Sequence, residues 1–175
     1  MAALVKADRD GQLAAKIDLV ISPTAESPAV KTAQDLGVAV AIVQYGEGFE
    51  SGLVEALEGF DWLCLAGFLR IVPDAVIHRL EGRVLNIHPS LLPKHGGKGM
   101  YGHRVHEAVL AAGDQESGCT VHWVTDGYDE GRPILQLRCP VERDDTADTL
   151  AARVLKLEHV AYAQALNQVV GERRT

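Results

Sequence analysis

The chain has 175 residues, 47% of them hydrophobic and 23% charged, which is the size and composition of one globular domain. Its net charge of -7 argues against a nucleic-acid partner, because proteins that bind nucleic acids present a basic face. No apolar run approaches the roughly 20 residues that span a bilayer, so we expect no membrane partner. Charged residues interrupt the N-terminal segment where a signal peptide has its apolar core: Lys6, Asp8, Arg9 and Asp10.

The three cysteines lie in apolar stretches and form no CxxC motif. Cys64, Cys119 and Cys139 are therefore interpreted as reduced core residues. Reduced cysteines and the lack of a signal peptide together predict a cytoplasmic protein.

The first half of the chain predicts alternating strands and helices. A weak helical pattern covers residues 3–15, and a short apolar run that ends in Ser-Pro predicts a buried strand at 17–22. The further expected strands are residues 38–43, 62–66 and 84–88, and the expected helices are 27–36, 48–58 and 73–80. Ser27 is a plausible N-cap, followed by Pro28 in the first turn. This alternation is typical of βαβ units with parallel strands.

The second half follows a different pattern. A helix is expected at residues 103–112, two strands at 118–125 and 133–141 with a tight polar connection, and one long helix at 146–170. Asp144, Asp145 or Thr146 caps this last helix. The expected fold is α/β and Rossmann-like: a mostly parallel sheet with flanking helices, antiparallel strands near the C-terminal half and a long C-terminal helix. Ligands of such folds bind beyond the carboxyl ends of the strands, where Gly67 and His88 are expected.

Asn86 and His88 lie two residues apart on a predicted strand, so their side chains point the same way, while Leu85 and Ile87 point into a core. An amide and an imidazole at the exit of a strand can both donate hydrogen bonds to one oxygen atom. The alternative is a polar pair that only satisfies buried backbone groups. Pro89 and Pro93 make the exit loop rigid, which favours a site that must be held still.

Residues 125–131 connect the two late strands and carry three carboxylates and two glycines. A solvated acidic hairpin would explain this composition, and the spacing does not fit a calcium-binding loop. A more specific hypothesis pairs one carboxylate with His88, which would orient the imidazole and favour its charged form.

Two other features carry less weight. Residues 96–99 (GGKG) lack the spacing of a phosphate-binding Walker motif and are interpreted as a flexible loop. His103, His106 and His122 are not arranged as a convincing metal-binding set, so no metal is expected.

Several motifs together resemble a known family. They are residues 67–71 (GFLRI), 86–93 (NIHPSLLP), 118–122 (GCTVH), 129–131 (DEG), and Arg153 through 158–159 (EH). From about residue 17 to about residue 170 the chain resembles the phosphoribosylglycinamide formyltransferases, within the folate-dependent formyltransferase superfamily. The NxHPSLLP string is highly specific for the superfamily, and the Glu-His pair and the lack of a second domain narrow the resemblance to this family.

The resemblance implies a single formyltransferase domain over residues 1–175, a monomer or homodimer, which transfers the formyl group of 10-formyltetrahydrofolate to the amine of 5-phosphoribosylglycinamide in purine biosynthesis. It implies the catalytic residues Asn86, His88 and Asp129. It implies a folate site at Leu69, Arg70, Ile71, Val72, Asp126 and Asp129. It implies an acceptor site at Gly67, Asn86, Pro89 and Glu158, and a cis peptide bond at Leu92–Pro93.

One departure concerns the N-terminus. The family begins with a strand and a glycine-rich loop that cradles the acceptor phosphate, whereas Met1 aligns past that loop, within the first helix. The strand and the loop are therefore expected to be missing from the chain. Two alternatives stay open: a 10-formyltetrahydrofolate deformylase, in which water replaces the amine, and a folate-binding remnant without catalysis.

Overall fold

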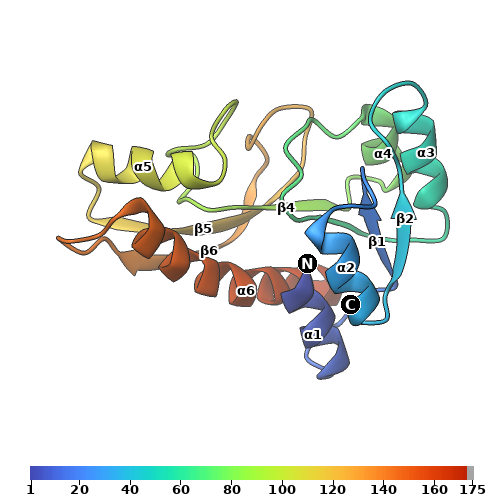
Figure 1. The fold of residues 1–175 in the computed structure, drawn as a ribbon, viewed down its shortest axis with the longest axis horizontal. Helices are drawn as coiled ribbons and strands as arrows, with labels where there is room; N and C mark the ends of the chain where they lie inside the picture. Colours follow the sequence, from blue (N-terminus) through green and yellow to red (C-terminus); the bar gives the residue numbers. More distant parts are fainter. Residues whose placement is uncertain (173–175) are drawn as a thin grey trace.

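The computed structural model describes residues 1–172. Its helices are α1 (Ala2–Arg9), α2 (Pro28–Asp35), α3 (Phe49–Ala56), α4 (Asp74–Arg79), α5 (His103–Ala112) and α6 (Ala147–Glu172). Its strands are β1 (Leu19–Ser22), β2 (Ala39–Ile42), β3 (Leu63–Leu65), β4 (Val84–His88), β5 (Glu116–Trp123) and β6 (Pro133–Pro140). The predicted α/β class, with parallel strands first, antiparallel strands later and a long C-terminal helix, is confirmed (Figure 1).

The strands form two sheets within the described residues. β1 and β2 form a parallel pair, and the other strands follow the order β3-β4-β5-β6. β3 and β4 run parallel, whereas β4, β5 and β6 run antiparallel to their neighbours. The sequence suggested one continuous sheet, and the separation of β1 and β2 from β3 is therefore a difference from that expectation.

Local signals set most of the boundaries. Ser27 caps α2, because its hydroxyl oxygen accepts a hydrogen bond from the amide of Ala29 at 3.3 Å. At the start of α6, the hydroxyl of Thr146 accepts from the amide of Thr149 at 3.2 Å, which identifies the cap among the three candidates. The first helix is shorter than predicted: it ends at Arg9, and Gly11 has a φ of 67° that a continuing helix does not permit.

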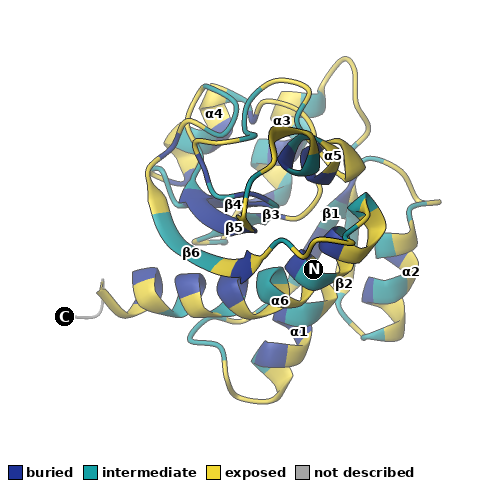
Figure 2. Ribbon diagram, turned by 90° about the vertical axis from the view of Figure 1, so that its left-hand side faces the viewer, coloured by how far each residue is buried: buried dark blue, intermediate teal, exposed yellow. Residues whose placement is uncertain are grey.

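Helices cover both faces of the four-stranded sheet. α6 runs along one face against β5 and β6, with α1 beside it, and its buried and exposed residues alternate along its length (Figures 1 and 2). On the other face, α3 and α4 cover a second core around Leu65 and Val84. The buried hydroxyl of Tyr162 ties α6 to the sheet, since it lies 2.9 Å from the carbonyl oxygens of both Leu65 and Leu85.

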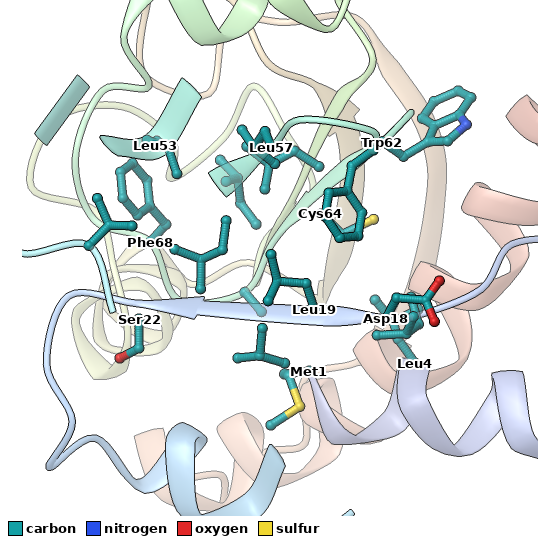
Figure 3. A pocket seen from close by; sticks show the side chains of 18 of the residues that line it. Met1, Leu4, Asp18, Leu19, Ser22, Leu53, Leu57, Trp62, Cys64 and Phe68 are labelled. Atoms are coloured by element: carbon teal, nitrogen blue, oxygen red, sulfur yellow. The ribbon is translucent and has the colours of Figure 1, made fainter. Parts of the chain in front are cut away.

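An apolar slot separates the two sheets (Figure 3). It has a volume of about 820 Å³ and is lined by β1 and β3. Further lining side chains come from α1 (Leu4) and from α3 and the residue after it (Leu53 and Leu57). Within the described residues, β1 pairs only with β2 and β3 only with β4, so the strand edges that face the slot have no strand partner.

Candidate active site

The exit of β4 carries the predicted amide and imidazole side by side. Asn86 and His88 line a cavity of about 860 Å³, which Ile87 also borders, while Leu85 is buried in the core under α6 and Ile87 packs against that core. This arrangement agrees with the alternation expected of the strand. His88 is only 4% exposed, so its contacts are made with protein groups rather than with bulk water.

Hydrogen bonds hold the loop that follows β4. The hydroxyl of Thr120 on β5 donates to the carbonyl of Ser90 at 2.7 Å and accepts from the amide of Leu92 at 3.0 Å. The side-chain amide of Gln136 on β6 donates both to that hydroxyl and to the carbonyl of Leu92, each at 2.9 Å. The Leu92–Pro93 peptide bond is cis, as the resemblance implied. Two strands thus fix the loop that begins at His88.

Asp129 lies beside His88, although the two residues are far apart in the sequence. The Nδ1 atom of His88 is 3.3 Å from Oδ2 of Asp129, and the same oxygen accepts a hydrogen bond from the amide of Gly97 at 3.0 Å. Asp129 has a φ of 58°, a left-handed conformation that aspartate tolerates better than most residues. The structure therefore brings together the amide, the imidazole and the carboxylate that the sequence singled out.

His122 completes this cluster. It lies opposite Asn86 in the β4–β5 ladder, and its Nδ1 faces the carbonyl oxygen of Trp123 at 2.8 Å. Its Nε2 lies 3.2 Å from Nδ2 of Asn86 and 3.6 Å from Oδ1 of Asp129, so this nitrogen contacts both the amide and the carboxylate. The NH2 group of Asn86 has two N–H bonds, so one is left for a ligand. Sequence reasoning rejected His122 as a metal ligand and noted it within the 118–122 motif, but gave it no role, because the register that pairs it with Asn86 is not visible in the sequence.

The other ring nitrogen of His88 is also occupied. Its Nε2 lies 2.8 Å from the main-chain oxygen of His95, so both nitrogens of the ring face acceptor oxygens. This geometry favours the imidazolium form, in which both nitrogens donate. Burial lowers the pKa of His88, and the negative charge of Asp129 opposes that shift.

The pKa of the Asp129 carboxyl lies below its usual value. Burial alone would raise this pKa, but contacts with His122, His88 and the amide of Gly97 outweigh burial. Asp129 is therefore an ionised carboxylate next to a buried imidazole, the arrangement that stabilises a positive charge on His88.

The cavity beside the cluster holds some of the predicted binding residues and not others. Those that line it are Gly67, Leu69, Asn86, His88, Pro89, Asp129 and Glu158. Arg70 instead lies over the ring of Tyr45, at 3.9 Å from its centroid, and Val72 is buried in the core at 2% exposure. Ile71 and Asp126 are exposed and lie outside the cavity lining.

Glu158, on α6, also lines this cavity. Burial raises the pKa of its carboxyl, and the amino group of Met1 partly opposes that shift. Within residues 1–172 the structure gives its side chain no hydrogen-bond or salt-bridge partner, so it is available to a ligand.

Neither a metal-binding cluster nor a membrane-spanning helix is found among residues 1–172. Residues 1–172 contain no group of three or more histidine, cysteine, aspartate or glutamate side chains placed to bind a metal ion. Among the helices described, none is long and apolar enough to cross a bilayer.

The fold and this cluster define an α/β protein with a ligand-sized cavity beyond the carboxyl ends of its strands. More particularly, the chain belongs to the formyl transferase family, whose model matches residues 1–166.

Three similar proteins are named for formyl transfer to glycinamide ribonucleotide. A chloroplastic phosphoribosylglycinamide formyltransferase of Vigna unguiculata is 38% identical over 96% of this chain and 56% of its own length. The chain thus spans little more than half of that relative. The crystal structure of phosphoribosylglycinamide formyltransferase from Brucella melitensis matches with a TM-score of 0.87 and 40% identity, over 97% of this chain and 88% of that one. Glycinamide ribonucleotide transformylase 1 from Symbiobacterium toebii matches with a TM-score of 0.89 and 34% identity, over 98% and 82%.

Proposed function

We propose that the chain transfers the formyl group of 10-formyltetrahydrofolate to the amine of 5-phosphoribosylglycinamide, a step of purine biosynthesis. The observation that carries this proposal is the convergence of Asn86, His88 and Asp129 on one cavity of about 860 Å³. The names of the Vigna, Brucella and Symbiobacterium proteins support it, since each names this formyl transfer or its acceptor.

The cluster suits a direct transfer. The acceptor amine attacks the formyl carbon, and negative charge develops on the formyl oxygen. The free N–H of Asn86 and the Nδ1–H of His88 donate hydrogen bonds to this oxygen, and one such donor typically contributes about 10²–10³ in rate. The contact of Nδ1 with Asp129 at 3.3 Å is longer than that of Nε2 with His95 at 2.8 Å, so in this proposal the Nδ1–H is shared between Asp129 and the formyl oxygen.

The proton balance involves the two substrates. The attacking nitrogen loses one proton, the bond between the formyl carbon and N10 of the folate breaks, and N10 gains one proton. Asp129 assists this relay through water and keeps His88 charged while the oxyanion exists. No covalent bond to the protein forms.

The binding residues divide between the two substrates. Leu69, Arg70, Ile71, Val72, Asp126 and Asp129 form the folate side in this proposal. Leu69 and Ile71 are 56% and 45% exposed, an apolar surface suited to a flat ring, with the Arg70 cation between them for the anionic tail. Gly67, Asn86, Pro89 and Glu158 form the acceptor side, where the Glu158 carboxylate accepts hydrogen bonds from the ribose hydroxyls.

The test is a formyl-transfer assay that follows the absorbance of the folate product with purified protein and both substrates. Asn86→Ala and His88→Ala should each lower kcat by about 10²-fold or more. His78→Ala is the matched control, since His78 is exposed on α4, outside the cavity lining.

Two results would contradict the proposal. One is a wild-type rate in both active-site variants. The other is consumption of the donor at the same rate without acceptor, which would identify hydrolysis instead of transfer.

A further inference from the structure

The loop after β4 contacts both members of the His88–Asp129 pair through its main chain. The carbonyl of His95 accepts from Nε2 of His88 at 2.8 Å, and the amide of Gly97 donates to Oδ2 of Asp129 at 3.0 Å. One short segment, residues 95–97, therefore determines where both side chains lie relative to each other.

The backbone of this segment has little freedom. His95 has a φ of 53°, in the left-handed region that residues other than glycine adopt rarely. At Gly96, an added Cβ would lie 2.4 Å from Cδ2 of Leu92, so the chain passes the exit loop in close contact. A change in the main chain at His95 would thus move the carbonyl that holds His88.

The side chain of His95 is held in turn by Asp114. Nε2 of His95 lies 2.7 Å from Oδ2 of Asp114, and Nζ of Lys94 lies 2.9 Å from Oδ1. The side chains of His95 and Asp114 are only 16% and 17% exposed, so water screens their contact less than it screens a surface pair.

The main chain of Asp114 is held in place at the C-terminal end of α5. It follows Gly113, which ends α5, and its own amide bonds to the carbonyl of Val109 at 3.3 Å. Contacts first with His95 and then with Lys94 lower the pKa of the Asp114 carboxyl, so it remains charged.

We propose that His95 and Asp114 form a positioning pair that fixes His88 and Asp129 in the geometry needed for formyl transfer. The pair acts through the main chain of residues 95–97 and does not touch the substrates. This inference rests on the proposed function for its kinetic consequences, while the geometry of His88 can be measured without turnover.

The experiment uses two substitutions at opposite ends of the contact. Asp114→Asn keeps the shape and removes the charge. His95→Asn removes the contact, because asparagine is too short to reach Asp114, yet asparagine tolerates the left-handed backbone. Asp148→Asn is the matched control: Asp148 forms a similar pair with His103 at 2.6 Å, but both side chains are largely exposed.

The measurements are kcat, KM for both substrates, and the NMR signal of the Nε2–H proton of His88. We expect kcat to fall about 10-fold in each variant, because small displacements of catalytic groups are costly, while KM changes less than about 2-fold. The double variant should lose no more than His95→Asn alone, because that substitution already removes the contact. The His88 proton signal should shift or broaden, and Asp148→Asn should match wild type.

The inference fails if the His88 proton signal is unchanged in both variants, or if their losses in kcat are additive. If wild-type protein transfers no formyl group at all, the proposed function fails, and the NMR signal still decides whether Asp114 positions His88.

Discussion

At the scale of single residues, His88 has opposing influences on its charge. Burial favours the neutral ring, whereas the carboxylate of Asp129 and the carbonyl of His95 favour the imidazolium. In the proposed reaction, the developing oxyanion adds a second negative charge near the ring. The oxyanion therefore adds to the stabilisation of the positive charge on His88 that Asp129 provides.

Asp129→Asn tests this balance. The proposed mechanism needs protonated His88, so activity is present at low pH and is lost as pH rises through the His88 pKa, which burial has already lowered. Without the Asp129 carboxylate, the pKa of His88 falls further, so kcat is lost at a lower pH than in the wild type. At neutral pH, kcat should therefore drop by about 10²–10⁴-fold. A pH–rate profile measures both effects. Glu130→Gln, a change at the exposed neighbouring carboxylate, should leave the profile unchanged.

At the scale of elements, the connection from β5 to β6 determines where Asp129 lies. The register between β5 and β6 shifts between Val121 and His122. Next to this shift, the main chain of Gly131 lies close to the main chain of Trp123. A Cβ at position 131 would lie 1.6 Å from the main-chain oxygen of Trp123, so only glycine fits without movement of the backbone. This close approach keeps the carboxylate near the end of β4.

Gly131→Ala should therefore lower stability and activity together. Forcing the strands apart should cost about 1–3 kcal/mol or more, and kcat should fall because Asp129 moves with the connection. Thermal melting and the transfer assay measure the two effects. Gly171→Ala, near the end of α6 with open space around it, should instead leave stability unchanged or raise it by up to about 1 kcal/mol. Equal melting temperatures for Gly131→Ala and wild type would contradict this account.

The sequence predicted what depends on local pattern. Alternation on β4 placed Asn86 and His88 together, and the helical repeat placed α6, because both signals lie within a few residues. It did not predict the contact of His122 with Asn86 or of His95 with His88, because these depend on strand register and on the path of a loop. The contact of Arg70 with the ring of Tyr45 was not predicted either, because it joins residues 25 positions apart in the sequence.

At the scale of the whole molecule, buried histidines couple stability to pH. His88 and His106 are each 4% exposed, and burial lowers the pKa of both; for His106, the neighbouring His103 and His88 lower it further. Nδ1 of His106 is buried without a hydrogen-bond partner in the described part of the chain. Burial therefore opposes a positive charge on each ring, and at His88 the carboxylate of Asp129 counteracts this effect in part.

The melting temperature should accordingly be highest at neutral pH. A group whose pKa is lowered by folding contributes stability above its unfolded pKa, about 6.5 for histidine, and this contribution is lost as pH falls through the folded value. Melting curves between about pH 5 and about pH 8 should show a decline that begins below about pH 6.5. His106→Gln removes one titrating ring and should make the decline shallower; a flat profile in wild type would exclude the coupling.

The slot between β1 and β3 has a consequence for local unfolding. No strand ladder joins β1 and β2 to the rest of the described chain, and α2 packs on this pair. In the 175-residue chain, this β1–α2–β2 unit should therefore open more readily than the four-stranded sheet. In hydrogen–deuterium exchange of this chain, the amides of β1 and β2 should exchange well before those of β4 and β5, whose protection should follow global unfolding. The chain would then behave as two units of unequal stability, with Asn86 and His88 in the more protected one.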